Sequence, residues 1–408
     1  MARLLAWLLP TVSVAASSRP LATPPPLDFH ALASELVSST PPELPAGVGS
    51  RAHVEAMVND AIAWCALNGL LVQFPMPPET SVTEASPPLV THAPFSLLPA
   101  AYPASALEHA KRLAPLFGAL VEAVGRNVPW LARTLKEAAD GDEYTRRLLK
   151  LCAQVQREGA TQPARLAILR SDYMLHEPEG ASSASLLQVE LNTVASSFGA
   201  LAARVGSLHA VLAQRWAGAR QHAWLAAGQP KVLSLEETLP PSKAVQQLAG
   251  ALAAAHGEYG VQGAVVLFVV QPDETNTIDQ ELLAQQLWAA HGVRSVRRTL
   301  AELAYEARLH GKERRLLLPS PSTEVAVVYF RAGYTPEDYP SQRHWDARTL
   351  LERSHAIKCP VSRTKRCREP QSHAGEEAHV GPRARARLAA AATAEAWLPC
   401  RCRALPCR

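Results

Sequence analysis

The first 360 residues contain little cysteine, and the chain has no apolar run of membrane-spanning length. Cys65, Cys152 and Cys359 are scattered, which excludes a disulfide scaffold and favours a reducing compartment. Four more cysteines crowd the end of the chain: Cys367, Cys400, Cys402 and Cys407. Their spacing forms no CxxC pair, so we expect no zinc site there. A spanning helix needs about 20 apolar residues, so we expect no membrane partner.

A strong charge is also missing from the body of the chain. The 408 residues carry a net charge of +4, but residues 361–408 alone hold ten Lys and Arg against four Asp and Glu. The first 360 residues therefore hold 31 basic and 33 acidic side chains. A slightly acidic body gives no electrostatic reason to expect a nucleic-acid partner. The length and the 48% hydrophobic content are typical of a globular protein with two or three domains.

Acidic residues are absent before Asp28, and this segment is rich in Ala, Leu and Ser and contains Arg3 and Arg19. Such a composition favours a transit peptide or a disordered extension over residues 1–27. A secretory signal fits less well, because the body shows no disulfide framework. We expect a cytoplasmic, plastid or mitochondrial protein.

Helical and strand patterns mix along residues 28–261, which we predict to be an N-terminal helical region. Apolar residues recur at helical spacing over 53–70, 105–125, 134–157, 201–227 and 243–256. Short apolar runs predict strands over 166–169 and 186–191.

Residues 262–360 have the clearest architecture. Continuous apolar strands are predicted over 265–270 and 324–330, a short strand over 293–299, and a helix over 278–291. Apolar strands that alternate with helices predict an α/β subdomain with a parallel sheet. We expect the fold class of the whole chain to be mixed, α/β here and α+β overall.

Polar residues follow two of these strands. Glu274, Asn276 and Gln280 come after the first, and Arg331 and Tyr334 come after the last. Ligands of parallel sheets bind beyond the carboxyl ends of the strands, and an arginine there can hold a carboxylate through two hydrogen bonds. The pattern predicts a crevice for a small charged ligand. Ordinary solvated loops are the alternative interpretation.

A third set of polar residues lies on and beside the strand predicted over 186–191. Gln188, Glu190 and Asn192 alternate with Val189 and Leu191, so the three polar side chains share one face. A carboxylate and an amide oxygen two residues apart suit Mg²⁺, which takes its remaining ligands from water and phosphate. A solvated strand face gives the same pattern, and the two interpretations stay open at this point.

Six motifs follow one another along residues 50–360, in this order: APFSLLP, LRSDYM, QVELNTVASSFG, DETNTIDQ, VVYFRAGYTPEDYP and ARTLLERSHAIKCP. In this combination the chain resembles eukaryotic-type glutathione synthase, and the YFRAGYTP form is most similar to the plant and algal branch. The resemblance implies an incomplete ATP-grasp fold, in which residues 28–261 contain part of the core and residues 262–360 form an inserted substrate-binding subdomain. It also implies a homodimer that joins γ-glutamylcysteine to glycine with ATP and Mg²⁺, through an acyl phosphate.

The resemblance also implies roles for individual residues. Glu190 and Asn192 would bind Mg²⁺, with Glu190 also near the nucleotide. The implied γ-glutamylcysteine-binding residues are Arg170, Val194, Ala195, Ser196, Ser197, Glu274, Thr275, Asn276, Gln280, Arg331, Ala332, Gly333 and Tyr334. No covalent catalytic residue is implied, because catalysis of this kind depends on positioning and charge neutralisation.

The resemblance stops at Pro360. The family's Gly-rich phosphate loop is not found, and no Gly-Gly pair occurs in the chain. Residues 361–408 are biased to Arg, Ala, Pro and Cys. We expect a truncated or mis-spliced form with doubtful activity of its own, and a genuine disordered basic tail is the rival interpretation. The alternative function is a non-catalytic γ-glutamylcysteine-binding or regulatory subunit that pairs with a full-length synthase.

Overall fold

The computed structural model describes residues 51–74, 89–100, 102–159, 162–177, 184–216, 239–319 and 323–360. Helices and strands mix along these segments, as the sequence predicts. The predicted extension 1–27 and the tail 361–408 lie outside the described residues. None of the helices in the described segments combines the length and the apolar content needed to cross a membrane.

The largest sheet in the described residues has six strands. β6 (Ser295–Thr299), β5 (Val265–Val270), β9 (Thr323–Phe330) and β10 (Ile357–Cys359) are parallel neighbours, which confirms the parallel pairing predicted for residues 262–360. β8 (Arg315–Leu318) pairs antiparallel with the start of β9, and β7 (Arg308–His310) pairs antiparallel with β8. This hairpin was not predicted, because the two strands are short and β7 lacks a continuous apolar run.

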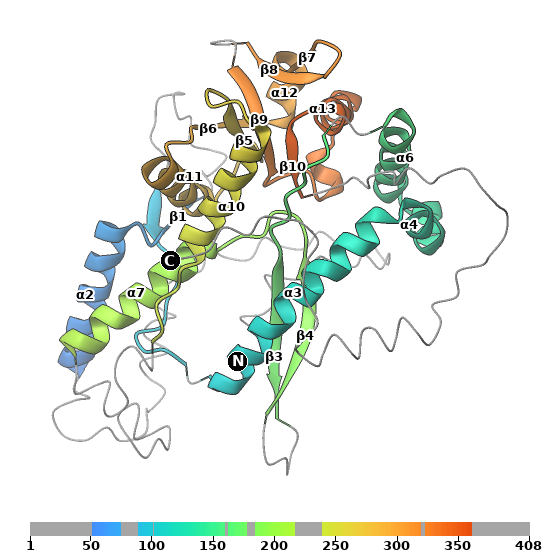
Figure 1. The fold of residues 1–408 in the computed structure, drawn as a ribbon. Helices are drawn as coiled ribbons and strands as arrows, with labels where there is room; N and C mark the ends of the chain where they lie inside the picture. Colours follow the sequence, from blue (N-terminus) through green and yellow to red (C-terminus); the bar gives the residue numbers. More distant parts are fainter. Residues whose placement is uncertain are drawn as a thin grey trace, which may run out of the picture. The chain divides into compact units, whose positions relative to one another are not determined.

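Helices cover both faces of this sheet (Figure 1). α10 (Ala244–Tyr259) and α11 (Thr277–His291) pack on the face that contains Val266 and Phe268. α12 (Leu300–Glu306) and α13 (Gln342–Arg353) pack on the face that contains Leu267 and Val269. Every residue of β5 is buried. Burial on both faces explains why β5 is continuously apolar rather than alternating.

A third apolar cluster joins the N-terminal helices to this layer. α2 (Arg51–Asn68) packs against α7 (Gly199–Arg215), and Ile278 and Leu282 of α11 reach the same cluster. A small hairpin, β1 (Leu71–Gln73) and β2 (Val90–His92), follows α2. α7 ends earlier than the helix predicted over 201–227, and residues 217–227 of that prediction lie outside the described part of the chain.

The helix predicted over 134–157 is divided. α3 (Ala104–Arg126) is followed by α4 (Val128–Thr134), α5 (Lys136–Gly141) and α6 (Glu143–Glu158). Asp142 lies between α5 and α6, and its carboxylate accepts hydrogen bonds from the backbone N–H groups of Tyr144 (3.3 Å) and Thr145 (2.7 Å). A capped helix start at Asp142 explains the division.

The strand predicted over 166–169 is wrong. Ile168 and Leu166 pack into the cluster beneath α10 and α11, and the Leu166 N–H donates to the Lys358 carbonyl at 3.3 Å. These residues are apolar because they fill the core beside β10. The neighbouring strand, β3 (Arg170–His176), pairs antiparallel with β4 (Ser185–Asn192), which confirms the strand predicted over 186–191.

Two free cysteines should not react with thiol reagents in the native chain. Burial raises the pKa of the Cys359 thiol to about 12 and also raises the pKa of Cys65. A raised pKa leaves almost no thiolate, the reactive form, at neutral pH. Brief iodoacetamide labelling at pH 8, followed by peptide mass spectrometry, should leave both unmodified and should modify both in urea. The labelling of Cys152, which is half-buried, serves as the comparison within the same chain. Rapid labelling of Cys359 in the native chain would contradict its burial.

Candidate functional site

The carboxyl ends of β5 and β9 lie side by side. The two strands are parallel, and Val269 pairs with Phe330. Residues 271–276 therefore leave the sheet beside residues 331–334, as predicted. A hydrogen bond from the Arg331 N–H to the Val269 carbonyl (2.8 Å) continues the pairing by one more residue.

Arg331 is the buried charge at this edge, and its side chain is only 3% exposed. Nη1 donates to the Ser196 carbonyl (3.3 Å) and to the Tyr329 hydroxyl (3.2 Å), and Nη2 donates to Ser197 Oγ (2.7 Å). Nε is buried and has no hydrogen-bond partner among the described residues. A buried donor without a partner is costly, so Nε is a natural position for a ligand oxygen.

The loop after β5 adds acceptors to the same edge. Glu274 accepts from the Asn276 N–H (2.8 Å) through Oε1 and from Gln280 Nε2 (2.6 Å) through Oε2. Asn276 Oδ1 and Gln280 Oε1 are buried without a described hydrogen-bond partner. The Thr275 carbonyl accepts from the Gln73 N–H at 3.2 Å. The two open acceptors suit an ammonium group, which has three donors.

The loop after β9 is fixed by one carboxylate. Asp338 Oδ2 accepts from the N–H groups of Gly333 and Tyr334, both at 3.0 Å. Ala332 is buried, whereas Tyr334 is exposed. The Tyr334 hydroxyl is nevertheless partly desolvated, which is the main reason why its pKa is raised, and the Asp338 carboxylate adds to the shift. Tyr334 is therefore protonated at neutral pH and can donate a hydrogen bond.

The turn after β4 closes the site from a third side. Val194 packs against the cluster beneath α12 and α13. Ser196 Oγ donates to the Ile168 carbonyl at 3.1 Å, and Ser197 Oγ donates to the Ala195 carbonyl at 2.8 Å. Ser196 and Ser197 are also the residues that contact Arg331, so the structure brings the 194–197 turn together with the two strand-end loops.

A second polar cluster lies on the β3–β4 hairpin. Arg170 pairs with Asp172 (Nε to Oδ1, 2.8 Å; Nη2 to Oδ2, 2.9 Å) and lies 3.7 Å from Glu190 Oε1. Asn192 Nδ2 donates to Glu190 Oε1 (2.9 Å) and to Asp172 Oδ2 (3.2 Å). Glu190 and Asn192 share a strand face, as predicted. The hydrogen bonds from Arg170 lower the pKa of Asp172, and the same pairing raises the pKa of Arg170.

Whether Mg²⁺ fits this hairpin depends on its donor atoms. Glu190 supplies a carboxylate and Asn192 an amide oxygen, both partly open to solvent. Among the described residues, no three His, Cys, Asp or Glu side chains form a metal cluster. Mg²⁺ commonly uses one or two protein carboxylates and fills its shell with water and phosphate, so the pair fits a Mg²⁺ ion that arrives with a nucleotide.

Two carboxylates of the site were missed by the sequence reasoning. Asp172 faces Glu190 in the neighbouring strand, and its position two residues after Arg170 was the available signal. Asp279 accepts from three backbone N–H groups at the start of α7 and lies 3.7 Å from Arg331. No sequence pattern indicates that role.

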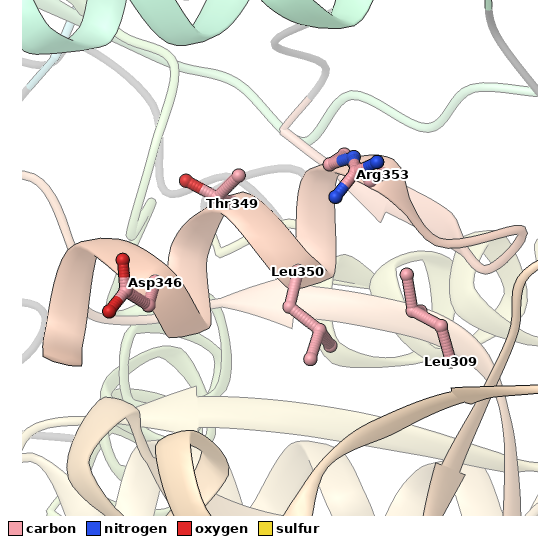
Figure 2. A pocket seen from close by; sticks show the side chains of 5 residues that line it. All are labelled: Leu309, Asp346, Thr349, Leu350 and Arg353. Atoms are coloured by element: carbon pink, nitrogen blue, oxygen red, sulfur yellow. The ribbon is translucent and has the colours of Figure 1, made fainter. Parts of the chain in front are cut away.

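A pocket of about 400 Å³ lies away from these residues, between α13 and β7 (Figure 2). Five residues line it: Leu309, Asp346, Thr349, Leu350 and Arg353. Its polar groups already have partners, because Asp346 accepts from Gln342 (2.7 Å) and Arg353 pairs with Glu158 (2.6 Å). It includes none of the predicted site residues.

The fold and the site define an α/β protein with buried, unpaired polar atoms at its strand ends, which is typical of proteins that bind a small charged ligand. Residues 51–316 match the family model for the ATP-binding domain of eukaryotic glutathione synthase. The chain therefore belongs to the eukaryotic glutathione synthase family.

Named relatives agree with the family. The chloroplastic glutathione synthetase of Solanum lycopersicum is 38% identical over 75% of this chain and 52% of that protein. The human glutathione synthetase is 35% identical over 79% of this chain and 64% of that protein. The chain thus spans about half to two thirds of the length of these relatives.

A solved structure supports the fold. A glutathione synthetase-like effector from Globodera pallida matches with a TM-score of 0.58 and 21% identity, over 78% of this chain and 64% of that one. A sequence identity of 21% supports a shared fold but does not indicate a shared ligand.

Proposed function

We propose that this chain binds γ-glutamylcysteine at the ends of β5 and β9 and is part of an ATP-dependent ligase that joins this dipeptide to glycine. The observation that carries the proposal is a set of buried polar atoms without described partners in the segments that follow the neighbouring strands β5 and β9. Arg331 Nε offers a donor, and Asn276 Oδ1 and Gln280 Oε1 offer acceptors. The γ-glutamyl end of the dipeptide carries an α-carboxylate, which can accept from the donor, and an α-ammonium group, which can donate to the two acceptors.

The other predicted residues have roles consistent with this ligand. Ser196 and Ser197 hold Arg331 in place, and the Glu274 carboxylate orients Gln280. We place Arg170 among the substrate contacts because it lies beside Glu190, at the hairpin end that leads into the 194–197 turn. Glu190 and Asn192 would hold Mg²⁺, which neutralises phosphate charge when bound with ATP. We also propose an ATP-grasp fold and a homodimer, which membership of the family supports. A plastid location is supported by the chloroplastic relatives.

The proposal is tested by calorimetric titration of the 408-residue chain with γ-glutamylcysteine. The matched control ligand is glutarylcysteine, which has the same length but lacks the α-ammonium group. Leaving a buried acceptor unpaired costs about 1–3 kcal/mol for each of the two acceptors, so we expect the control to bind at least roughly tenfold more weakly.

Three outcomes separate the alternatives. Binding of γ-glutamylcysteine together with glutathione formation from glycine and Mg·ATP supports a ligase. Binding without product formation supports the non-catalytic binding subunit. Equal affinity for both ligands, or no binding of either, overturns the assignment of the strand-end site.

A further inference from the structure

We propose that Asp279 is a positioning residue that holds Arg331 and the start of α7 in the geometry that the substrate site requires. This inference rests on the proposed function, because it names the residue that builds the dipeptide site. Asp279 lies in the first turn of α11 and is 3% exposed. Its neighbour Gln280 is one of the predicted binding residues, but Asp279 itself was not predicted.

The Asp279 carboxylate caps a helix that belongs to another part of the chain. Oδ2 accepts from the Phe198 N–H (3.0 Å), and Oδ1 accepts from the N–H groups of Ala200 (3.0 Å) and Leu201 (3.1 Å). N–H groups in the first turn of a helix have no partner within that helix. A carboxylate at this end also interacts favourably with the helix dipole. One side chain of α11 therefore accepts the hydrogen bonds of the otherwise unpaired N–H groups at the start of α7.

The turn that this carboxylate holds is conformationally costly. Ala195 (φ 48°) and Phe198 (φ 69°) both adopt the left-handed region although neither is glycine. Each such residue costs about 1–2 kcal/mol. Hydrogen bonds from outside the turn offset this cost, and the bond from the Phe198 N–H to Asp279 lies at one of the two positions. Ser196 and Ser197, which contact Arg331, lie between them.

The same carboxylate fixes the guanidinium of Arg331. Arg331 Nη2 lies 3.7 Å from Asp279 Oδ2, and the two side chains are 3% and 4% exposed. A buried guanidinium requires a counter-charge. Because Asp279, Ser196 and Ser197 lie beside the two Nη atoms, Nε is the remaining open donor. Asp279 thus orders two walls of the site together: the 194–198 turn and the arginine.

The test is a double-mutant cycle in the full chain, with γ-glutamylcysteine as the calorimetric probe. Asp279→Asn keeps the size of the side chain but removes its charge and one acceptor. Arg331→Lys keeps the charge but loses the forked geometry. We expect each single variant to bind about tenfold more weakly. We expect the double variant also to lose about tenfold rather than a hundredfold, because residues that act through one another are not additive.

The matched control is Asp60→Asn. Asp60 also tethers α7, at the opposite end of the helix, where it accepts from Arg215 Nε (2.7 Å) and Trp216 Nε1 (3.1 Å). The two ends of this 17-residue helix are about 25 Å apart. A general loosening of α7 would weaken binding in both aspartate variants. A positioning role predicts a loss in Asp279→Asn and an affinity within twofold of the wild type in Asp60→Asn.

The outcomes keep this inference distinct from the proposed function. If the wild type does not bind γ-glutamylcysteine, the proposed function fails and this inference fails with it. If the wild type binds and Asp279→Asn stays within twofold, or the losses add to about a hundredfold, only the inference is overturned. If Asp279→Asn shows no cooperative unfolding, Asp279→Glu takes its place under the same criteria.

Discussion

Replacing Arg348 with methionine should destabilise the chain by about 3–5 kcal/mol, which is the usual cost of removing one partner from a buried ion pair. Arg348 Nε donates to Glu352 Oε1 at 3.0 Å, and the side chains are 5% and 1% exposed. Its guanidinium also lies 4.0 Å from the centroid of the Phe330 ring. The variant leaves a buried carboxylate without its arginine. Urea denaturation followed by circular dichroism measures the loss.

The control lies on the same helix. Arg353→Met removes an arginine whose side chain is 36% exposed and whose partner is Glu158, 2.6 Å away. Solvent-accessible ion pairs contribute about 0–1 kcal/mol, so this variant should stay within about 1 kcal/mol of the wild type. Equal losses in Arg348→Met and Arg353→Met would show that burial of the Arg348 pair has no particular importance.

Gly333→Ala should both destabilise the chain and weaken γ-glutamylcysteine binding. Gly333 has a φ of +90°, and a Cβ there would lie 2.7 Å from Tyr339 Oη and 3.0 Å from Arg348 Nη1. Its carbonyl accepts from Tyr144 (3.1 Å), Tyr339 (2.9 Å) and Arg348 (3.4 Å). A left-handed alanine costs about 1–2 kcal/mol, and displacing this buried network costs about 1–3 kcal/mol more. Thermal unfolding and calorimetric titration measure the two effects.

Gly263→Ala is the matched control for this substitution. Gly263 lies outside the positive-φ region, and an added Cβ would meet nothing within 4 Å. It should leave both stability and binding close to wild type. If Gly333→Ala were destabilised but bound the dipeptide as tightly as the wild type, the 331–334 loop would have no part in the site.

The sequence predicted the placement of several polar residues well where a strand pattern located them. Continuous apolar runs fixed β5 and β9 to within one residue, and parallel strands end at a common edge. The residues after each run were therefore expected to meet, and Arg331 and Glu274 do lie at the ends of neighbouring strands. Period-2 alternation likewise placed Glu190 and Asn192 on one face, where they hydrogen-bond.

Other features depend on partners that are distant in the sequence. Leu166–Leu169 has the composition of a strand, but its side chains fill the core beside β10 and the segment forms no strand. The helix predicted over 134–157 divides at Asp142, because a local cap overrides the apolar periodicity. The β7–β8 hairpin exists because the start of β9 offers it an open edge.

By itself, the sequence determined the mixed α/β architecture, the order of the polar segments and the family, because periodicity and motif order are local properties of the chain. Only the tertiary structure decided which atoms of the site remain without partners. Arg331 Nε and Gln280 Oε1 are open because Ser197, Glu274 and Asp279 occupy the atoms beside them. These contacts join residues up to 134 positions apart. Such hydrogen bonds leave no local pattern, so the geometry of the site follows from the packing of α7 and α11 against the sheet.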